Sequence, residues 1–161
     1  MELVKRKDLR LQAYDYSAPG AYFVTICTRN RKNFFWKNVG ASIARPEDIS
    51  FTNEGEVVRR AVEQIPQKYP AISIEHYVVM PNHLHILLQI NTDEDGRALL
   101  APTVVKVVQQ LKGYVTKQIG VSLWQKSFYD HVVRTEQDYR DIWEYIDGNP
   151  SKWMDDEYYQ L

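Results

Sequence analysis

The chain has one cysteine, Cys27, among its 161 residues. A single thiol excludes an internal disulfide framework and a cysteine-based zinc site. The sequence also lacks a G-x-x-x-x-G-K-S/T loop, so we expect no nucleotide cofactor. No apolar run reaches the length of a membrane span, and the charged amino terminus contains no apolar signal segment. These absences predict a cytoplasmic protein with no membrane association.

An excess of charge of one sign is also missing. Twenty Lys and Arg residues stand against 21 Asp and Glu residues, for a net charge of −1. This is not typical of a nonspecific nucleic-acid binder, so any such binding must come from local patches. What is present is an apolar fraction of 44% with 12% aromatics, which is enough for a packed core. The length then predicts one domain over residues 1–161.

Apolar periodicity predicts the order strand, helix, strand, strand, helix, strand, helix. The expected strands cover residues 21–29, 72–79, 83–90 and 127–133, with a further short one near Ala41–Ala44. The expected helices run from 53 to Pro66 or Pro70, from 102 to Gly120, and from Thr135 to about Asp147. Split β-α-β units of this kind predict an α+β, ferredoxin-like sandwich. Its sheet is mostly antiparallel, with helices packed on one face and a C-terminal helix after the last strand.

Two histidines begin the strand expected at 83–90, in the run Asn82-His83-Leu84-His85. Side chains on a strand alternate between faces, so both imidazoles leave the same face and Leu84 leaves the other. Two adjacent imidazoles at the edge of a core suit a divalent metal better than they suit packing. The pattern therefore predicts a metal site. The alternative is two partly exposed histidines with no ligand.

The last helix offers a nucleophile and a further ligand. Tyr145 lies about a right angle or more from the middle of its apolar stripe, so it is not an obvious core residue. Asn149 follows one turn later, nominally on the same side. Pro150 pushes Asn149 away from helical geometry, so Asn149 is either a ligand or only a helix cap. Tyr114 and Gln118 repeat the spacing on the preceding helix, and spacing alone does not choose between the two tyrosines.

Four blocks of the sequence carry a resemblance to a known family. They are 10–25, Asn82–His85, Trp124–Arg134 and Asp138–Pro150, and together they resemble the REP-associated tyrosine transposases. These form a branch of the single-tyrosine HUH transposases of the IS200-like superfamily, where HUH denotes His-hydrophobic-His. The resemblance covers most of the chain and is weakest over 34–70. It implies that His83 and His85 bind the metal, that Asn149 is the third ligand, and that Tyr145, not Tyr114, is the nucleophile.

The resemblance also implies an activity. The expected reaction is single-stranded DNA nicking and strand transfer through a 5′-phosphotyrosine, with Mg²⁺ or Mn²⁺ as cofactor. The expected partner is single-stranded DNA with a hairpin or palindromic repeats, bound by a monomer or homodimer. A larger HUH enzyme, such as a replication initiator or relaxase, is disfavoured because 161 residues leave no room for a helicase. A noncatalytic DNA- or RNA-hairpin binding module on the same fold remains the alternative.

Basic residues are the candidate DNA contacts, because their positive charge attracts the phosphates of the DNA backbone. They are Lys5, Arg6, Lys7, Arg10, Arg29, Arg31, Lys32, Lys126 and Arg134. For any one of them, an ordinary solvated charge is the simpler interpretation. Tyr14, Tyr16 or Trp36 are candidates for stacking on bases, whereas Trp124 and Phe128 are expected in the core. His76 and His131 are expected to be structural, with His131 the better candidate for a role near the metal.

Overall fold

A four-stranded antiparallel sheet forms the centre of the protein, in a computed structural model that describes residues 18–39, 46–93, 95–96 and 102–160. The strand order is β2-β3-β1-β4. The strands are β1 Gly20–Cys27, β2 Ile72–Val79, β3 His83–Ile90 and β4 Tyr129–Val133. The strand expected near Ala41–Ala44 lies outside the described residues. The antiparallel sheet of the predicted α+β class is confirmed.

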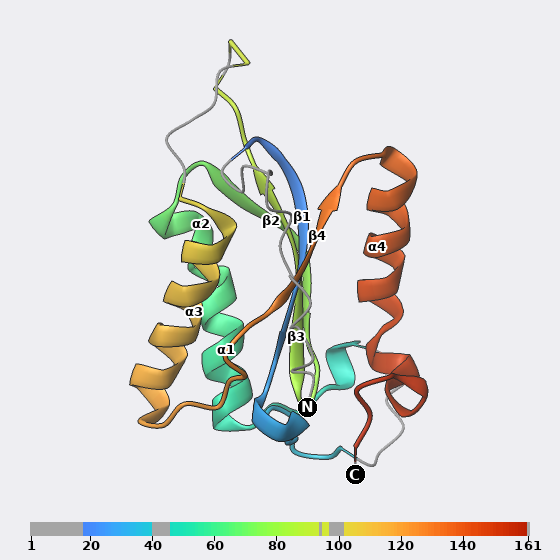
Figure 1. Cartoon of the computed structure of the whole chain (residues 1–161). Coiled ribbons are helices and arrows are strands. Elements are labelled where there is room, and N and C mark those ends of the chain that lie inside the picture. Colours follow the sequence, from blue (N-terminus) through green and yellow to red (C-terminus); the bar gives the residue numbers. More distant parts are fainter. Residues whose placement is uncertain (1–17, 40–45, 94, 97–101, 161) are drawn as a thin grey trace, which may run out of the picture.

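Helices cover both faces of this sheet. Figure 1 shows α1, α2 and α3 on one face and α4 on the other. Their bounds are α1 Asn53–Glu63, α2 Ile65–Lys68, α3 Val104–Ile119 and α4 Glu136–Gly148, with 3-10 turns η1 Arg29–Arg31, η2 Pro46–Asp48 and η3 Pro150–Asp155. The prediction of one helical face therefore holds for the first three helices, and the C-terminal helix covers the opposite face. No helix in the described part of the chain combines the length and apolarity that a bilayer span requires.

Threonine side chains start the three long helices. Thr52, Thr103 and Thr135 each accept a hydrogen bond from the backbone N–H three residues later. A cap of this kind contributes about 1 kcal/mol to helix stability. The prediction that Pro66 or Pro70 ends the first helix is wrong, because α1 ends at Glu63 and Pro66 lies in the first turn of α2. Proline is tolerated there because the first turn needs no N–H donor.

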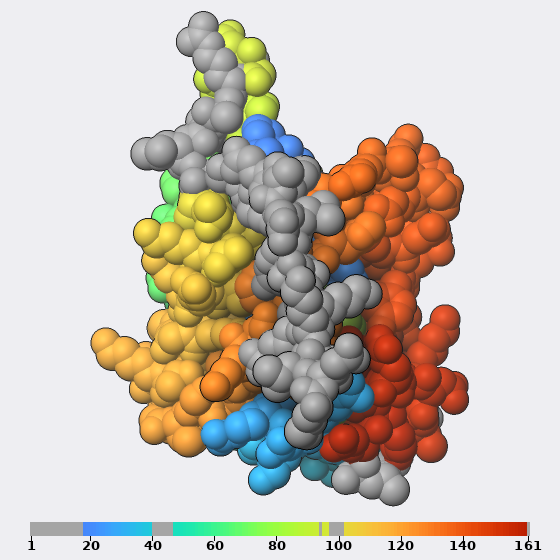
Figure 2. Space-filling view, viewed as in Figure 1, coloured from blue at the N-terminus to red at the C-terminus, as the bar shows by residue number. Residues whose placement is uncertain are grey.

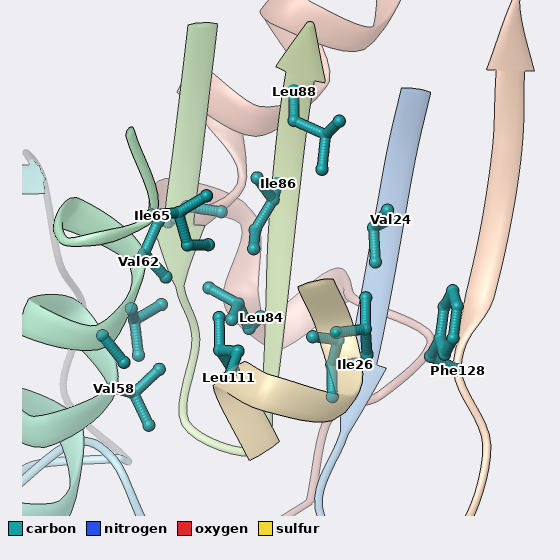
Figure 3. Close-up of a cluster of buried hydrophobic side chains, with 14 of the residues drawn as sticks. Val24, Ile26, Val58, Val62, Ile65, Leu84, Ile86, Leu88, Leu111 and Phe128 are labelled. Atoms are coloured by element: carbon teal, nitrogen blue, oxygen red, sulfur yellow. The ribbon is translucent and has the colours of Figure 1, made fainter. Parts of the chain in front are cut away.

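The side chains of β3 divide between the two faces of the sheet. Leu84, Ile86 and Leu88 point toward α1 and α3, where they join the apolar core (Figure 3). Core partners drawn in the same view are Val24, Ile26, Val58, Val62, Ile65 and Leu111. Because strand residues alternate, the histidines on either side of Leu84 face α4 instead. The main core thus fixes the position of the histidine pair.

Candidate active site

The two histidines of β3 lie side by side and are buried. Their relative exposures are 0% for His83 and 2% for His85, and their ring centroids are 4.6 Å apart with an interplanar angle of 72°. In the sheet register, His83 stands opposite Cys27 and His85 opposite Thr25 on β1. The rings therefore meet on one face, as the alternation predicts, and the interpretation of two partly exposed histidines is wrong.

The tautomer of His83 is set by Asn82. The Nδ2 group of Asn82 donates to the backbone oxygens of Arg31 and Tyr158, at 3.1 and 2.7 Å. Its Oδ1 therefore faces His83 and accepts a hydrogen bond from Nδ1 at 2.8 Å. A neutral imidazole that donates through Nδ1 carries its lone pair on Nε2. His83 is thus oriented as a metal-binding histidine would be.

His85 is oriented in the same way by Thr25. Its Nδ1 lies 2.8 Å from the Oγ1 atom of Thr25, and donation to this hydroxyl leaves the lone pair on Nε2. Both histidines of β3 then have Nδ1 engaged by the protein. The sequence contains no local signal for this contact, because the two residues are sixty positions apart and meet only through strand pairing.

Three buried lone-pair atoms remain without partners. Within the described part of the chain, Nε2 of His83, Nε2 of His85 and Oδ1 of Asn149 make no hydrogen bond. Buried polar atoms are rarely left unpaired in native proteins. Two imidazole nitrogens and an amide oxygen suit a divalent transition ion, so this set fits the predicted metal. No three His, Cys, Asp or Glu side chains form a metal-binding cluster among the described residues.

Burial keeps both imidazoles neutral. It lowers the pKa of His83 to about 3, although the side chain of Asn149 beside the ring opposes part of this shift. It also lowers the pKa of His85 well below its ordinary value, and the proximity of His83 adds to the effect. Neutral imidazole is the form that binds metal ions, so the pair needs no deprotonation at neutral pH.

Asn149 keeps helical geometry at the end of α4, so the expectation that Pro150 moves it out of helical geometry is wrong. Its backbone angles are φ −62° and ψ −43°, so it continues the helix by one residue before Pro150 begins η3. It therefore lies one helical turn after Tyr145, on the same side of α4. Its side chain does not cap the helix, because Nδ2 donates to Oδ2 of Asp156 at 2.8 Å. The amide oxygen has no hydrogen-bond partner among the described residues, and the Asn149 side chain lies beside the His83 ring.

Tyr145 lies beside the pair and is open to solvent. Its side chain is 44% exposed, and its ring centroid is 5.3 Å from that of His85. Phe23 on β1 packs edge-on against it at 6.2 Å. Partial burial raises the pKa of Tyr145 to about 12, and the carboxylates of Asp156 and Glu157 contribute. The phenol is therefore protonated at neutral pH.

Tyr114, the other tyrosine with a suitable spacing, is on α3 across the sheet. It packs against the core there, and the Nζ atom of Lys68 lies 5.1 Å from its ring centroid. Of the two candidates, only Tyr145 is on the face that carries the histidines (Figure 1).

A second tyrosine near the histidines was not predicted. The ring of Tyr158 lies 4.5 Å from that of His83, and the guanidinium of Arg31 lies 5.1 Å above it. Tyr158 belongs to the segment after η3. Trp153 within η3 is buried in the core and holds this part of the chain in place. Residues 155–159 show no periodicity, so the sequence contains no signal for this placement. Cys27 lies nearby, but burial raises its pKa to about 11, so it remains a thiol.

The predicted basic contacts do not all lie in one place. Arg29, Arg31, Lys32 and Lys126 are exposed at the end of the sheet where β3 begins. Two backbone hydrogen bonds, from Arg29 to Leu123 and from Gln125 to Cys27, hold their two segments together. In Figure 2 the light-blue residues of this end lie next to the dark-red C-terminal segment. Arg134 is at the opposite end of the sheet, and Lys5, Arg6, Lys7 and Arg10 lie outside the described residues.

The remaining aromatic and histidine candidates do not join the site. Trp36 is 3% exposed and donates through Nε1 to the backbone oxygen of Val79, so the prediction that it stacks on bases is wrong. Tyr14 and Tyr16 lie outside the described residues. Trp124 and Phe128 are buried, as predicted. His76 and His131 are hydrogen-bonded to carboxylates on α4 instead, to Asp147 at 3.3 Å and to Asp138 at 2.6 Å respectively.

The histidine pair predicts acid sensitivity of the metal-free protein. The pKa of His83 falls from 6.5 to about 3 on folding, so between these values the unfolded chain binds more protons. The contribution of His83 to the free energy of unfolding is therefore fully present above pH 6.5. It falls as the pH falls, by about 2 kcal/mol at pH 5. His85 acts in the same direction. Urea unfolding at pH 7.5 and pH 5.0 measures this loss.

The matched control for acid sensitivity is the double variant His83→Gln, His85→Gln. It has no imidazole at the site, so acidification should destabilise it less than the wild type. Equal losses in both proteins would show that the buried pair does not control acid stability.

Comparison with known proteins gives three findings. An uncharacterized protein of Haemophilus influenzae is 30% identical over 173 residues, which span 96% of this chain and 93% of that protein. The REP-associated tyrosine transposase of Escherichia coli is 25% identical over 138 residues, 85% of this chain and 70% of that protein. A solved REP-associated tyrosine transposase bound to a REP hairpin has a TM-score of 0.62 at 23% identity, covering 89% of this chain and 74% of that one.

The structural likeness, at this identity, shows a shared fold, and the two sequence relatives extend along most of the chain. No protein-family model matches the sequence. The chain therefore belongs to one family with the Haemophilus influenzae protein and is a distant homologue of the REP-associated tyrosine transposases.

Proposed function

We propose that this protein nicks single-stranded DNA next to a hairpin and transfers the cut strand, with Tyr145 as nucleophile. One observation carries the proposal. The exposed phenol of Tyr145 lies beside His85, the second of the paired histidines. Nε2 of His83, Nε2 of His85 and Oδ1 of Asn149 are buried and have no hydrogen-bond partner among the described residues. A packed structural core has no use for three such atoms in one place. A site for a cation and a phosphate gives each of them a function.

His83, His85 and Asn149 are the residues that would hold the metal ion. A bound Mg²⁺ or Mn²⁺ supplies Lewis-acid polarisation of the phosphate and offsets its developing negative charge. Nitrogen donors favour Mn²⁺ somewhat over Mg²⁺, which prefers oxygen ligands and water. Burial contributes by keeping both imidazoles neutral, and Thr25 and Asn82 contribute by fixing their orientation.

The reaction assigned to Tyr145 is a phosphoryl transfer. Its phenolic oxygen gives up its proton and forms a bond to phosphorus while the bond from phosphorus to the 3′ oxygen breaks. The departing oxygen takes up a proton, so no net proton is gained or lost. The products are a 5′-phosphotyrosine and a free 3′ hydroxyl. Attack by a 3′ hydroxyl on this intermediate rejoins the strand and releases the tyrosine. The covalent bond conserves the energy of the phosphodiester, so the reaction requires no nucleotide cofactor.

The proposed substrate is a hairpin in single-stranded DNA. The solved relative binds a REP hairpin, and the basic cluster of Arg29, Arg31, Lys32 and Lys126 gives this chain a surface for phosphates next to the site. A net charge of −1 does not prevent this chain from binding DNA, because the four basic residues are clustered. A phosphate is attracted mainly by charges within about 10 Å, since salt screens those farther away.

The basic cluster should control affinity for the hairpin. Replacing Arg29, Lys32 and Lys126 with Ala is expected to weaken binding at low salt by at least tenfold. The slope of log affinity against log salt should become shallower by about 0.7 for each single-strand phosphate that the variant no longer neutralises. Fluorescence anisotropy with a labelled hairpin at several salt concentrations measures both quantities. Lys106→Ala, an exposed lysine on α3 across the sheet, is the control and should leave binding unchanged.

A covalent-adduct assay tests the proposed function. The full chain is incubated with hairpin DNA that has unpaired flanks, in the presence of Mn²⁺ or Mg²⁺, and the products are separated under denaturing conditions. We expect a protein–DNA adduct that a chelator prevents, with the DNA attached to the peptide that contains Tyr145. Tight binding to the hairpin with no adduct would instead support a noncatalytic hairpin-binding module.

A further inference from the structure

Asp156 is a buried carboxylate next to the proposed metal ligands. Its side chain is 2% exposed, although its neighbours Asp155 and Glu157 are exposed. Oδ2 accepts a hydrogen bond from Nδ2 of Asn149 at 2.8 Å, and Oδ1 accepts one from the backbone N–H of Tyr158 at 2.8 Å. Oδ2 also lies 3.9 Å from Nε2 of His83. The carboxylate thus lies against Asn149 and His83, two of the three proposed metal ligands.

The first consequence is a fixed orientation of the Asn149 amide. A carboxylate only accepts hydrogen bonds, so it selects the Nδ2 end of the amide. The Oδ1 end must then point away from Asp156, and it is the atom left without a partner beside the histidines. Without Asp156, rotation of the amide by half a turn would present N–H groups to the site, and these cannot bind a cation.

The second consequence concerns charge. The three proposed ligands bring no charge to a bound cation, because imidazole coordinates a metal in its neutral form and an amide is neutral. A divalent cation would therefore bring two uncompensated charges into a buried place, which is costly. Asp156 places one negative charge within hydrogen-bond reach of a ligand, where low exposure to water strengthens its effect.

We infer that Asp156 is a positioning residue of the metal site, which fixes the Asn149 amide and supplies negative charge behind it. The inference rests on the proposed function, because it assumes that His83, His85 and Asn149 hold a divalent ion. Asp156 acts through its hydrogen bond to Asn149. Groups in this position commonly change metal affinity by 10- to 100-fold when they are removed.

Titration of the full chain with Mn²⁺, followed by electron paramagnetic resonance of the free ion, tests this inference without any DNA. Asp156→Asn keeps an acceptor for the Asn149 amide but removes the charge, and we expect about tenfold weaker binding. Asp156→Ala removes both, and we expect weaker binding still, up to about 100-fold. Asp155→Asn is the matched control, since it changes the net charge equally at an exposed neighbouring position and should bind Mn²⁺ as the wild type does.

The outcomes separate this inference from the proposed function. Suppose that Mn²⁺ binds the wild type, that binding is lost in His83→Ala, and that both Asp156 variants bind as Asp155→Asn does. The metal site then stands and the role of Asp156 is disproved. If the wild type itself binds no Mn²⁺, both proposals fail. Urea unfolding of each metal-free variant shows whether it is folded, and Asp156→Asn, which keeps the size of the side chain, provides the test if Asp156→Ala does not fold.

Discussion

Replacement of Tyr145 with Phe is expected to abolish the covalent protein–DNA adduct, with a loss in rate of at least a thousandfold. The substitution removes the oxygen atom that forms the bond to phosphorus in the proposed reaction. Hairpin binding should change less than twofold, because Phe retains the ring that contacts His85 and Phe23. Adduct formation is followed on denaturing gels, and binding by anisotropy under the same conditions.

Two other tyrosines make this prediction specific. Tyr114→Phe, on the far side of the sheet, should form the adduct at the wild-type rate. Tyr158→Phe is the more demanding comparison, because its ring also borders the histidines, 4.5 Å from His83. It should still form an adduct. If instead Tyr158→Phe loses the adduct and Tyr145→Phe keeps it, the nucleophile comes from the C-terminal segment and the assignment to α4 is incorrect.

Much of the secondary structure around this site follows from local sequence patterns. Alternation of apolar residues sets β3 and places Leu84 in the core, and this forces both histidines onto the other face. Thr103 and Gly120, with φ of 91°, define the two ends of α3, because capping depends on a few neighbouring residues. The helical position of Tyr145 relative to Asn149 is equally local, since one turn separates them.

The contacts that complete the site are not local, and no sequence pattern indicates them. Thr25 reaches His85 only because β1 pairs with β3 in a particular register. Asp156 and Tyr158 arrive through a 3-10 turn that starts at Pro150 and has no apolar period. Trp36 is a plausible stacking residue by sequence but is buried, and its indole N–H donates to the backbone oxygen of Val79. Each of these depends on tertiary packing between distant segments.

The histidine pair carries the second large prediction. The double variant His83→Gln, His85→Gln is expected to lose Mn²⁺ binding by more than about 100-fold and to form no adduct, because two of the three proposed ligands lose their imidazole. Hairpin affinity should remain within about twofold of wild type, since Arg29, Lys32 and Lys126 are untouched. Metal titration, the adduct assay and anisotropy on the same preparation measure the three quantities.

This combination separates a catalytic pair from a structural one. If the imidazoles only fill space, then glutamine, which is similar in size, should alter stability and leave metal-dependent chemistry intact. If they hold the ion, chemistry is lost while the fold and the hairpin surface persist. An Mn²⁺-dependent adduct that survives in the double variant would therefore disprove the metal site. The unpaired Nε2 atoms of His83 and His85 would then be a cost of packing alone, about 1–3 kcal/mol for each buried atom.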